Sequence, residues 1–175
     1  MGINKLKEIE KETLANFKKH RPSEYFSHLE GDDAFNDFKK LVESVYRYGL
    51  CFPPEFFDGK SLIDLGSGTG DWIIFSAIWG AKCTLVEMND DAIEIAKDVF
   101  KKHSPKFEEH HFINSSLYDF DYSSYKEKFD IGHSRGVLTH VADKELGFRI
   151  LASLIKPGGY LIFSDRNTAG GIQEM

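Results

Sequence analysis

Long apolar runs, cysteines and prolines are all scarce in this chain of 175 residues. No apolar stretch approaches the roughly 20 residues that a membrane-spanning helix needs, and the charged N-terminus lacks the apolar centre of a signal peptide. The 2 cysteines, Cys51 and Cys83, have neither the Cys-x-x-Cys spacing nor the spacing of zinc ligands. We therefore expect a soluble cytoplasmic protein, without a membrane partner, in which both thiols are buried and reduced.

An excess of positive charge is also absent. The 22 lysines and arginines are outnumbered by 28 aspartates and glutamates, which gives a formal net charge of −6. This balance repels a phosphate backbone, since the basic residues are scattered among acidic ones, and we expect no nucleic-acid partner. The adjacent His110 and His111 point to opposite faces of an expected strand and cannot easily share an ion, so no metal site is predicted.

What the chain does contain is enough apolar material for one core. With 41% hydrophobic and 14% aromatic residues over this length, a single compact domain is expected. The sequence pattern changes near residue 60, from helical segments to alternating strand and helix segments, and this change divides the domain into two parts. We expect residues 1–58 to form an N-terminal helical cap and residues 59–175 to form a cofactor-binding α/β core.

Two amphipathic helices are predicted in the N-terminal part. Apolar residues at helical spacing predict the first over residues 3–20. The second is expected to begin at a cap formed by Asp32 or Asp33 and to stop near Gly49. Aromatic residues of this part, such as Phe17, either roof a binding site or pack the helices together, and packing is the default expectation.

Short apolar runs alternate with helical patterns from residue 61 onward. This alternation is typical of a doubly wound α/β fold with a mainly parallel sheet, in which ligands bind outside the carboxyl ends of the strands. The expected strands are residues 61–65, 83–87, 108–113, 129–133 and 160–165, and the expected helices are residues 71–79, 90–102 and 144–155.

A glycine loop follows the first expected strand and opens a helix. Glycines at Gly66, Gly68 and Gly70 permit a tight turn and let backbone N–H groups approach a ligand closely. The dinucleotide fingerprint Gly-x-Gly-x-x-Gly requires a glycine where Asp71 stands here. The spacing therefore disfavours a nicotinamide-dependent oxidoreductase.

Two acidic residues narrow the kind of ligand further. Asp64 precedes the loop by two residues, where its charge opposes a pyrophosphate but suits a ligand that carries ammonium and sulfonium charges. Glu87 ends the second expected strand, from which its carboxylate can accept hydrogen bonds from both hydroxyls of a ribose. The two residues thus favour a cationic cofactor whose adenosine lies across the sheet.

Four segments together resemble successive signatures of class I S-adenosylmethionine-dependent methyltransferases. They are Asp64–Gly70 (DLGSGTG), Leu85–Met88 (LVEM), Phe129–His140 (FDIGHSRGVLTH) and Leu154–Tyr160 (LIKPGGY). The resemblance covers roughly residues 60–165 and implies the Rossmann-like methyltransferase fold with S-adenosylmethionine as cofactor. It further implies methionine contacts from Gly66, Ser67, Gly68 and Gly70, beside Asp64, a ribose contact from Glu87 and an adenine contact from Met88.

The chain departs from this family at one position. Many members carry an aspartate near the adenine amino group after the third strand, whereas Ser116 stands there in this sequence. A serine hydroxyl accepts a hydrogen bond without the charge of a carboxylate, and the backbone of Leu117 offers a second contact. We expect these two residues to complete the cofactor site.

Two histidines are candidates for a general base. Methyl transfer depends mainly on holding acceptor and donor close together, but a hydroxyl or a protonated amine must also lose a proton. His140 occupies a place where similar small-molecule methyltransferases keep a catalytic histidine, and His133 ends the fourth expected strand. Arg135 could pair with an acidic substrate, the cofactor or a structural carboxylate, and nothing in the sequence separates these roles.

The leading hypothesis is a methyltransferase that acts on a small-molecule acceptor beneath the N-terminal helices. The alternatives are a module that binds S-adenosylmethionine or a partner without catalysis and, less favoured, a nicotinamide-dependent oxidoreductase. The family sheet continues with C-terminal strands that we expect this chain to lack. Either the chain is a truncated methyltransferase cut from a longer protein, or a homodimer or another partner chain covers the open edge.

Overall fold

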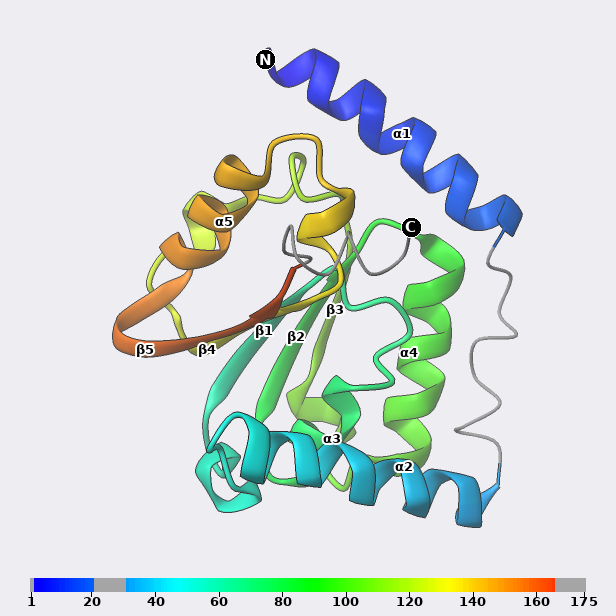
Figure 1. Cartoon of the computed structure of the whole chain (residues 1–175), viewed down its shortest axis with the longest axis vertical. Helices are drawn as coiled ribbons and strands as arrows, with labels where there is room; N and C mark the ends of the chain where they lie inside the picture. Colours follow the sequence, from blue (N-terminus) through cyan, green and yellow to red (C-terminus); the bar gives the residue numbers. More distant parts are fainter. Residues whose placement is uncertain (1, 21–30, 166–175) are drawn as a thin grey trace, which may run out of the picture.

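A computed structural model describes residues 2–20 and 31–165 of the chain. Its centre is a sheet of five parallel strands in the order β3-β2-β1-β4-β5, drawn in Figure 1. The strands are β1 (Ser61–Leu65), β2 (Lys82–Glu87), β3 (His111–Asn114), β4 (Phe129–Arg135) and β5 (Ile155–Ser164). The prediction of a doubly wound α/β fold with a parallel sheet is confirmed.

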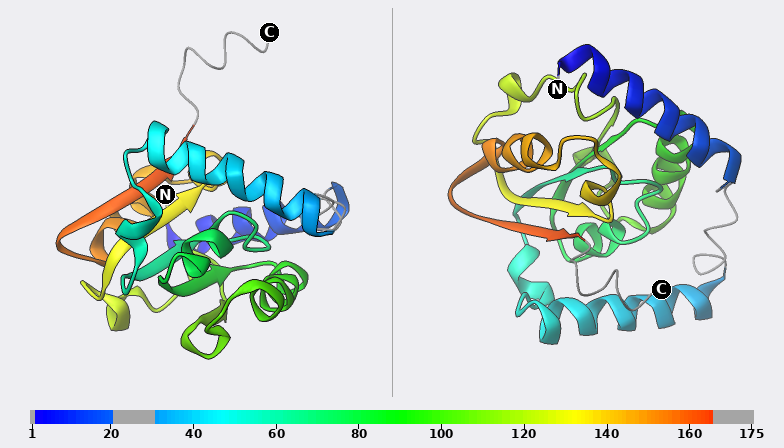
Figure 2. Two further views of the ribbon diagram at one scale, coloured as in Figure 1. Left: turned by 90° about the horizontal axis from the view of Figure 1, so that it is seen from below. Right: turned by 45° about the horizontal axis from the view of Figure 1, so that its top comes forward.

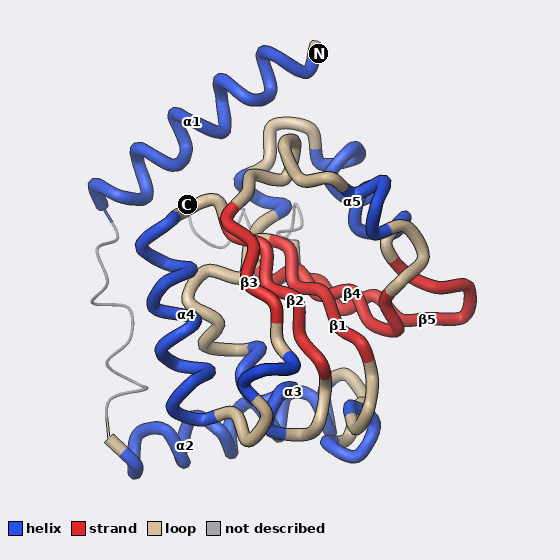
Figure 3. Tube along the Cα trace, turned by 180° about the vertical axis from the view of Figure 1, so that it is seen from behind, coloured by secondary structure: helices blue, strands red, loops and turns tan. Residues whose placement is uncertain are grey.

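Helices cover the sheet on both faces (Figure 3). They are α1 (Ile3–His20), α2 (Asp32–Ser44), α3 (Ile73–Ile78), α4 (Asp90–His103) and α5 (Lys144–Ser153). A π-helical turn, Val45–Gly49, continues α2, which confirms that this helix stops near Gly49. Among the described residues, no helix is both long and apolar enough to cross a membrane.

Two apolar clusters show how alternation along the strands divides the core. Leu62 and Leu85 pack in the cluster that includes buried residues of α2, α3 and α4. Their sequence neighbours Ile63 and Val86 pack in the other cluster, with residues of α5 and with Leu6 of α1. Because successive strand residues point to opposite faces, the two clusters lie on either side of the sheet.

Three local predictions were wrong. β5 begins at Ile155 rather than near residue 160, because Pro157–Gly159 form an irregular stretch inside the strand, where the pairing jumps from Phe129–Ile155 to Ile131–Tyr160. The residue at the start of α2 is Gly31, with no side-chain cap, so neither expected aspartate caps this helix. Cys51 is exposed, because it lies in the turn after the π-helical segment, outside both apolar clusters, whereas Cys83 is buried as expected.

The third strand is also shorter than expected. Residues 107–109 form a turn of 3-10 helix, and the strand begins only at His111. The stretch between β3 and β4 has no α-helix but one short 3-10 turn, Tyr122–Tyr125, in agreement with its irregular Ser/Tyr/Asp sequence. The loop after β3 is therefore left next to the carboxyl ends of the strands, and α1 lies across this end of the sheet (Figure 2).

Candidate functional site

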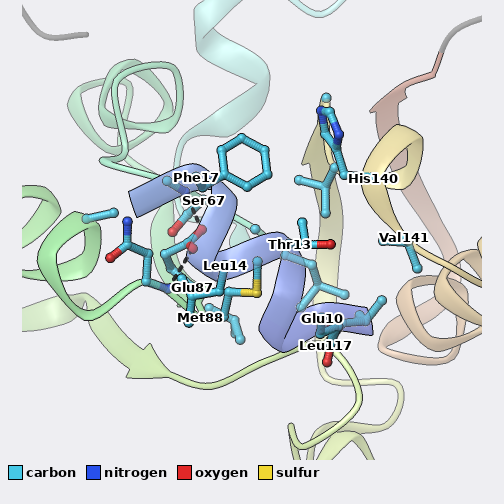
Figure 4. A pocket seen from close by; sticks show the side chains of 18 of the residues that line it. Glu10, Thr13, Leu14, Phe17, Ser67, Glu87, Met88, Leu117, His140 and Val141 are labelled. Atoms are coloured by element: carbon cyan, nitrogen blue, oxygen red, sulfur yellow. Dashed lines mark hydrogen bonds between the residues drawn. The ribbon is translucent and has the colours of Figure 1, made fainter. Parts of the chain in front are cut away.

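A cavity of about 370 Å³ lies at the carboxyl ends of the strands, beneath α1. Five segments meet around it, and Figure 4 shows most of their side chains. The lining residues include Glu10, Thr13, Leu14 and Phe17 of α1, Gly66, Ser67 and Gly68 after β1, Glu87, Met88 and Asn89 at the end of β2, Ser115 and Leu117 after β3, and Arg135, Val137, His140 and Val141 after β4.

The glycine loop forms the floor of the cavity at β1. Gly66 and Gly68 have φ angles of 72° and 55°, in the left-handed region that other residues rarely adopt. A Cβ atom on Gly66 would lie only 2.4 Å from a methyl group of Val137. The loop is fastened to the neighbouring strand, because the Gly66 N–H donates to the Val86 carbonyl oxygen at 2.8 Å. Only glycine therefore fits at Gly66.

Gly70 has a different task from the other two glycines. It does not line the cavity, and a Cβ atom on it would lie 3.0 Å from the Phe100 ring and 3.2 Å from the Leu85 side chain. It therefore permits close packing of the loop against α4 and β2. The expected methionine contact from Gly70 has no support in this placement.

Glu87 stands at the end of β2 with its carboxylate held from two sides. The N–H of Gly68 donates to Oε2 at 2.8 Å, and the N–H of Asn89 donates to Oε1 at 2.9 Å. Burial raises the pKa of this carboxyl group, although both N–H donors act in the opposite direction. Each oxygen keeps a second lone pair, so Glu87 can accept two further hydrogen bonds from a ligand in the cavity.

Asp64 and His133 form a buried pair below the cavity. They are register neighbours on β1 and β4, they are 4% and 2% exposed, and His133 Nδ1 lies 2.9 Å from Asp64 Oδ1. On the other side of the ring, His133 Nε2 lies 3.0 Å from the Tyr46 hydroxyl. Neither Asp64 nor His133 lines the cavity. This placement favours a structural role for His133 over the expected catalytic one, and a supporting role for Asp64 over direct contact with a cofactor.

His140 and Arg135 lie at the side of the cavity that follows β4. The exposed His140 ring meets the Phe17 ring of α1 edge-on, with 5.2 Å between centroids. The Arg135 guanidinium lies over the Trp72 ring at 3.6 Å from its centroid. Stacking accounts for its position, and no salt bridge of Arg135 is found within residues 2–20 and 31–165. His140 is thus the predicted base that the structure does bring to the cavity.

Ser116 is turned away from the cavity, although its neighbours Ser115 and Leu117 line it. Its hydroxyl accepts from the Asp119 N–H at 3.1 Å and donates to the Asp119 carboxylate at 3.3 Å, which closes a local turn. Of the residues expected to bind a cofactor, the structure brings together Gly66, Ser67, Gly68, Glu87, Met88 and Leu117, and leaves Asp64, Gly70 and Ser116 outside the lining.

The N-terminal helices were expected to cover the acceptor, but the residues of α1 that line the cavity were not identified from the sequence. Glu10, Thr13, Leu14 and Phe17 line the cavity, whereas Phe17 was expected to serve helix packing. The first helix itself and its apolar positions are evident from the sequence, and they were the only signal available. Tyr46, the partner of His133, carries no local signal at all, since 87 residues separate the two.

Comparisons with known proteins agree with this architecture. A family model described as "Methyltransferase domain" matches residues 36–175. The chain is 30% identical to arsenite methyltransferase of Rattus norvegicus over 138 residues, which cover 74% of this chain and 37% of that protein. It is 34% identical over 110 residues to the ubiquinone biosynthesis O-methyltransferase of Coxiella burnetii, covering 62% of this chain and 44% of that protein.

Solved structures share the fold at lower sequence identity. A SAM-dependent methyltransferase of Leishmania major superposes with a TM-score of 0.60 at 18% identity, over 86% of this chain and 58% of that one. The chain spans about two fifths of the length of the two curated relatives, with coverages of 37% and 44%. The family match, which extends over most of the chain, establishes that this protein belongs to the family of methyltransferase domains.

Proposed function

We propose that this domain binds S-adenosylmethionine and transfers its methyl group to a small-molecule acceptor. The observation that carries the proposal is the carboxylate of Glu87, held by the N–H groups of Gly68 and Asn89 beside the glycine loop. A fixed carboxylate at the end of β2 suits the two hydroxyls of a ribose, and it stands next to the loop that suits the methionine part.

The residues present fit this cofactor in shape and polarity. Gly68 lines the cavity and has nothing within 4 Å of the place where a Cβ atom would stand, so a ligand can approach the backbone there. The Ser67 hydroxyl is buried and has no hydrogen-bond partner within the described part of the chain, although it lines the cavity. A buried polar atom of this kind favours a polar ligand group as its partner.

Each part of the cavity has a role in the proposed reaction. When bound, the cofactor would supply a methyl group on a positively charged sulfur: a lone pair of the acceptor would bond to the methyl carbon in line while the carbon–sulfur bond breaks and its electron pair stays on the sulfur. The glycine loop and Glu87 hold the donor side in place, while α1 covers the cavity and excludes water. The acceptor then lies on the side that follows β4, near Arg135 and His140.

His140 is proposed as the general base for a hydroxyl acceptor. Its ring stands at the cavity edge against Phe17, and a neutral imidazole can take up the proton that the hydroxyl loses. The likeness to an O-methyltransferase supports a hydroxyl as the acceptor group. For such an acceptor, His140→Ala is expected to lower kcat by about 100-fold or more with little change in cofactor affinity.

Calorimetric titration with S-adenosylmethionine, followed by a screen for S-adenosylhomocysteine release with small hydroxyl-bearing acceptors and with arsenite, tests the proposal. Binding with turnover supports it. No binding at several hundred micromolar cofactor would contradict the proposal. Binding without turnover on any acceptor would favour the non-catalytic module, and saturable binding of NADH would favour the oxidoreductase.

A partner along β5 also stays a prediction, as does a cytoplasmic location. β5 is an edge strand of the described sheet, and Tyr160 and Phe163 on it are 45% and 47% exposed. Exposed aromatic rings on an unpaired edge favour a second copy or another chain as cover. Light scattering after size-exclusion chromatography measures the oligomeric state directly, and a monomer at high concentration would exclude the homodimer.

A further inference from the structure

Glu10 of α1 carries a carboxylate that the proposed reaction does not use. The residue is half-buried and lines the cavity beside Leu117, as Figure 4 shows. Its Oε2 atom is buried and has no hydrogen-bond partner in the part of the chain that the structure describes. An unpaired acceptor oxygen is costly to bury, so this atom favours a donor group from a ligand.

The hydrogen-bond donors near Glu10 all come from the loop after β3. Burial raises the pKa of the carboxyl group, while the Ser116 hydroxyl and the N–H groups of Leu117 and Tyr118 lower it. The nearby lysine of α1, Lys7, pairs with Asp119 instead. No salt bridge to Glu10 is found among the residues that are described, so the carboxylate remains available to a neutral N–H donor.

The order of the strands shows which part of a cofactor meets Glu10. The glycine loop follows β1, Glu87 ends β2, and Leu117 follows β3, which is the next strand outward. A cofactor with its methionine part at the loop and its ribose at Glu87 therefore directs its base toward β3. Met88 and Leu117 line that end of the cavity together with Glu10.

We propose that Glu10 accepts a hydrogen bond from the amino group of the adenine base and so determines the specificity of the cavity for adenine. The inference rests on the proposed function and goes further, since it assigns base recognition to the helical cover. Ser116 does not take this role in the observed arrangement, because it does not line the cavity and its hydroxyl is hydrogen-bonded to Asp119. Leu117 lines the cavity next to Glu10, and its N–H group already donates to the Glu10 carboxylate.

The test compares two ligands that differ at this amino group. S-adenosylhomocysteine carries the amino group, whereas S-inosylhomocysteine carries a carbonyl oxygen there, which would face the Glu10 carboxylate as a second acceptor. Wild-type protein is expected to prefer S-adenosylhomocysteine by about tenfold or more in calorimetric Kd. In Glu10→Gln the side-chain amide can donate to the carbonyl oxygen, and the preference is expected to fall to about threefold or less.

Glu8→Gln is the matched control, since Glu8 lies on the same helix, is exposed and pairs with Lys5. This variant should keep the wild-type preference. Because the preference is a ratio within each variant, a general loss of stability does not alter it. Tight binding of S-adenosylhomocysteine with an unchanged preference in Glu10→Gln would overturn the role of Glu10 alone. Failure of the wild type to bind either ligand would overturn the proposed function as well.

Discussion

The two halves of the cavity are built in different ways. In the half made by the strand ends, backbone N–H groups hold the glycine loop to Val86 and hold the carboxylate of Glu87 in place. The half made by α1 is attached through the buried Leu6, the ring contact of Phe17 and exposed ion pairs such as Lys18 with Asp90. The first half is therefore arranged before a ligand arrives, whereas the second can be stabilised by the ligand that it covers.

The largest expected effect is a loss of stability where the strand-end half meets the core. His133→Ala removes the hydrogen-bond partner of the buried Asp64 and of Tyr46, and leaves the Asp64 carboxylate unpaired. We expect the free energy of unfolding to fall by about 3 kcal/mol, measured by urea denaturation. A variant that keeps wild-type stability but loses kcat would show instead that His133 is a catalytic residue.

Next in size is the loss of the fixed carboxylate. Glu87→Ala removes an acceptor for two ribose hydroxyls and releases the N–H groups of Gly68 and Asn89. Affinity for S-adenosylhomocysteine is expected to fall by about 100-fold in calorimetry. Glu94→Ala is the control, since Glu94 lies exposed on α4 and pairs with Lys97. Equal affinities in the two variants would contradict the role of Glu87.

A smaller loss of stability is expected from changing Asp130, which lies at the opposite end of β4, away from the cavity. Burial alone would raise the pKa of Asp130, but hydrogen bonds from Lys156 and Ser61 overcome this and bring it to about 2. Because its unfolded value is about 4, the ionised carboxylate adds stability above pH 4 that disappears as the pH falls toward 2.

Asp130→Asn should therefore lose on the order of 1 kcal/mol at pH 7 and show a shallower loss of stability in acid than the wild type. Urea denaturation at pH 7 and pH 3 measures both. Cofactor affinity at pH 7 should be unchanged, because Asp130 does not line the cavity. A fall in affinity would mean that the two ends of the strand are coupled.

The smallest effect is expected on the α1 side. Replacing Lys7 and Lys18 together by alanine removes the ion pairs with Asp119 and Asp90, both of which are exposed. Affinity for the cofactor should fall by only about twofold, and added salt should reduce the difference. Hydrogen exchange of α1 should speed up while the exchange of β1 and β2 stays the same. Slower exchange in all three elements on ligand binding would weaken the contrast between the halves.

The strand-end half could be predicted because its information is local in sequence. Gly66 and Glu87 each stand at the end of an apolar strand, and parallel strands bring such ends together. The role of Asp64 could not be predicted in the same way. Its position before the loop suggested a charge directed at the ligand, but the strand register places His133 beside it and takes up the carboxylate.

A helical cover over the acceptor was predicted, but its lining residues could not be, because helical spacing shows that a helix is amphipathic and not which of its side chains face a ligand. Glu10 reads as one of several charged residues on a solvated face, yet it lines the cavity. The early start of β5 was missed for a different reason. Pro157 and the glycines after it favour a turn, and only the pairing with β4 shows that the strand continues through them.

The chain of hydrogen bonds from Asp64 through His133 to Tyr46 has a consequence for how the family can diversify. The three side chains come from β1, β4 and the turn after α2, and each is buried. Replacing one of them leaves buried polar groups of the others without hydrogen-bond partners, which costs stability. Replacing all three by apolar residues of similar volume removes this cost. We therefore expect these positions to change together among relatives, as a single inherited unit rather than as three independent sites.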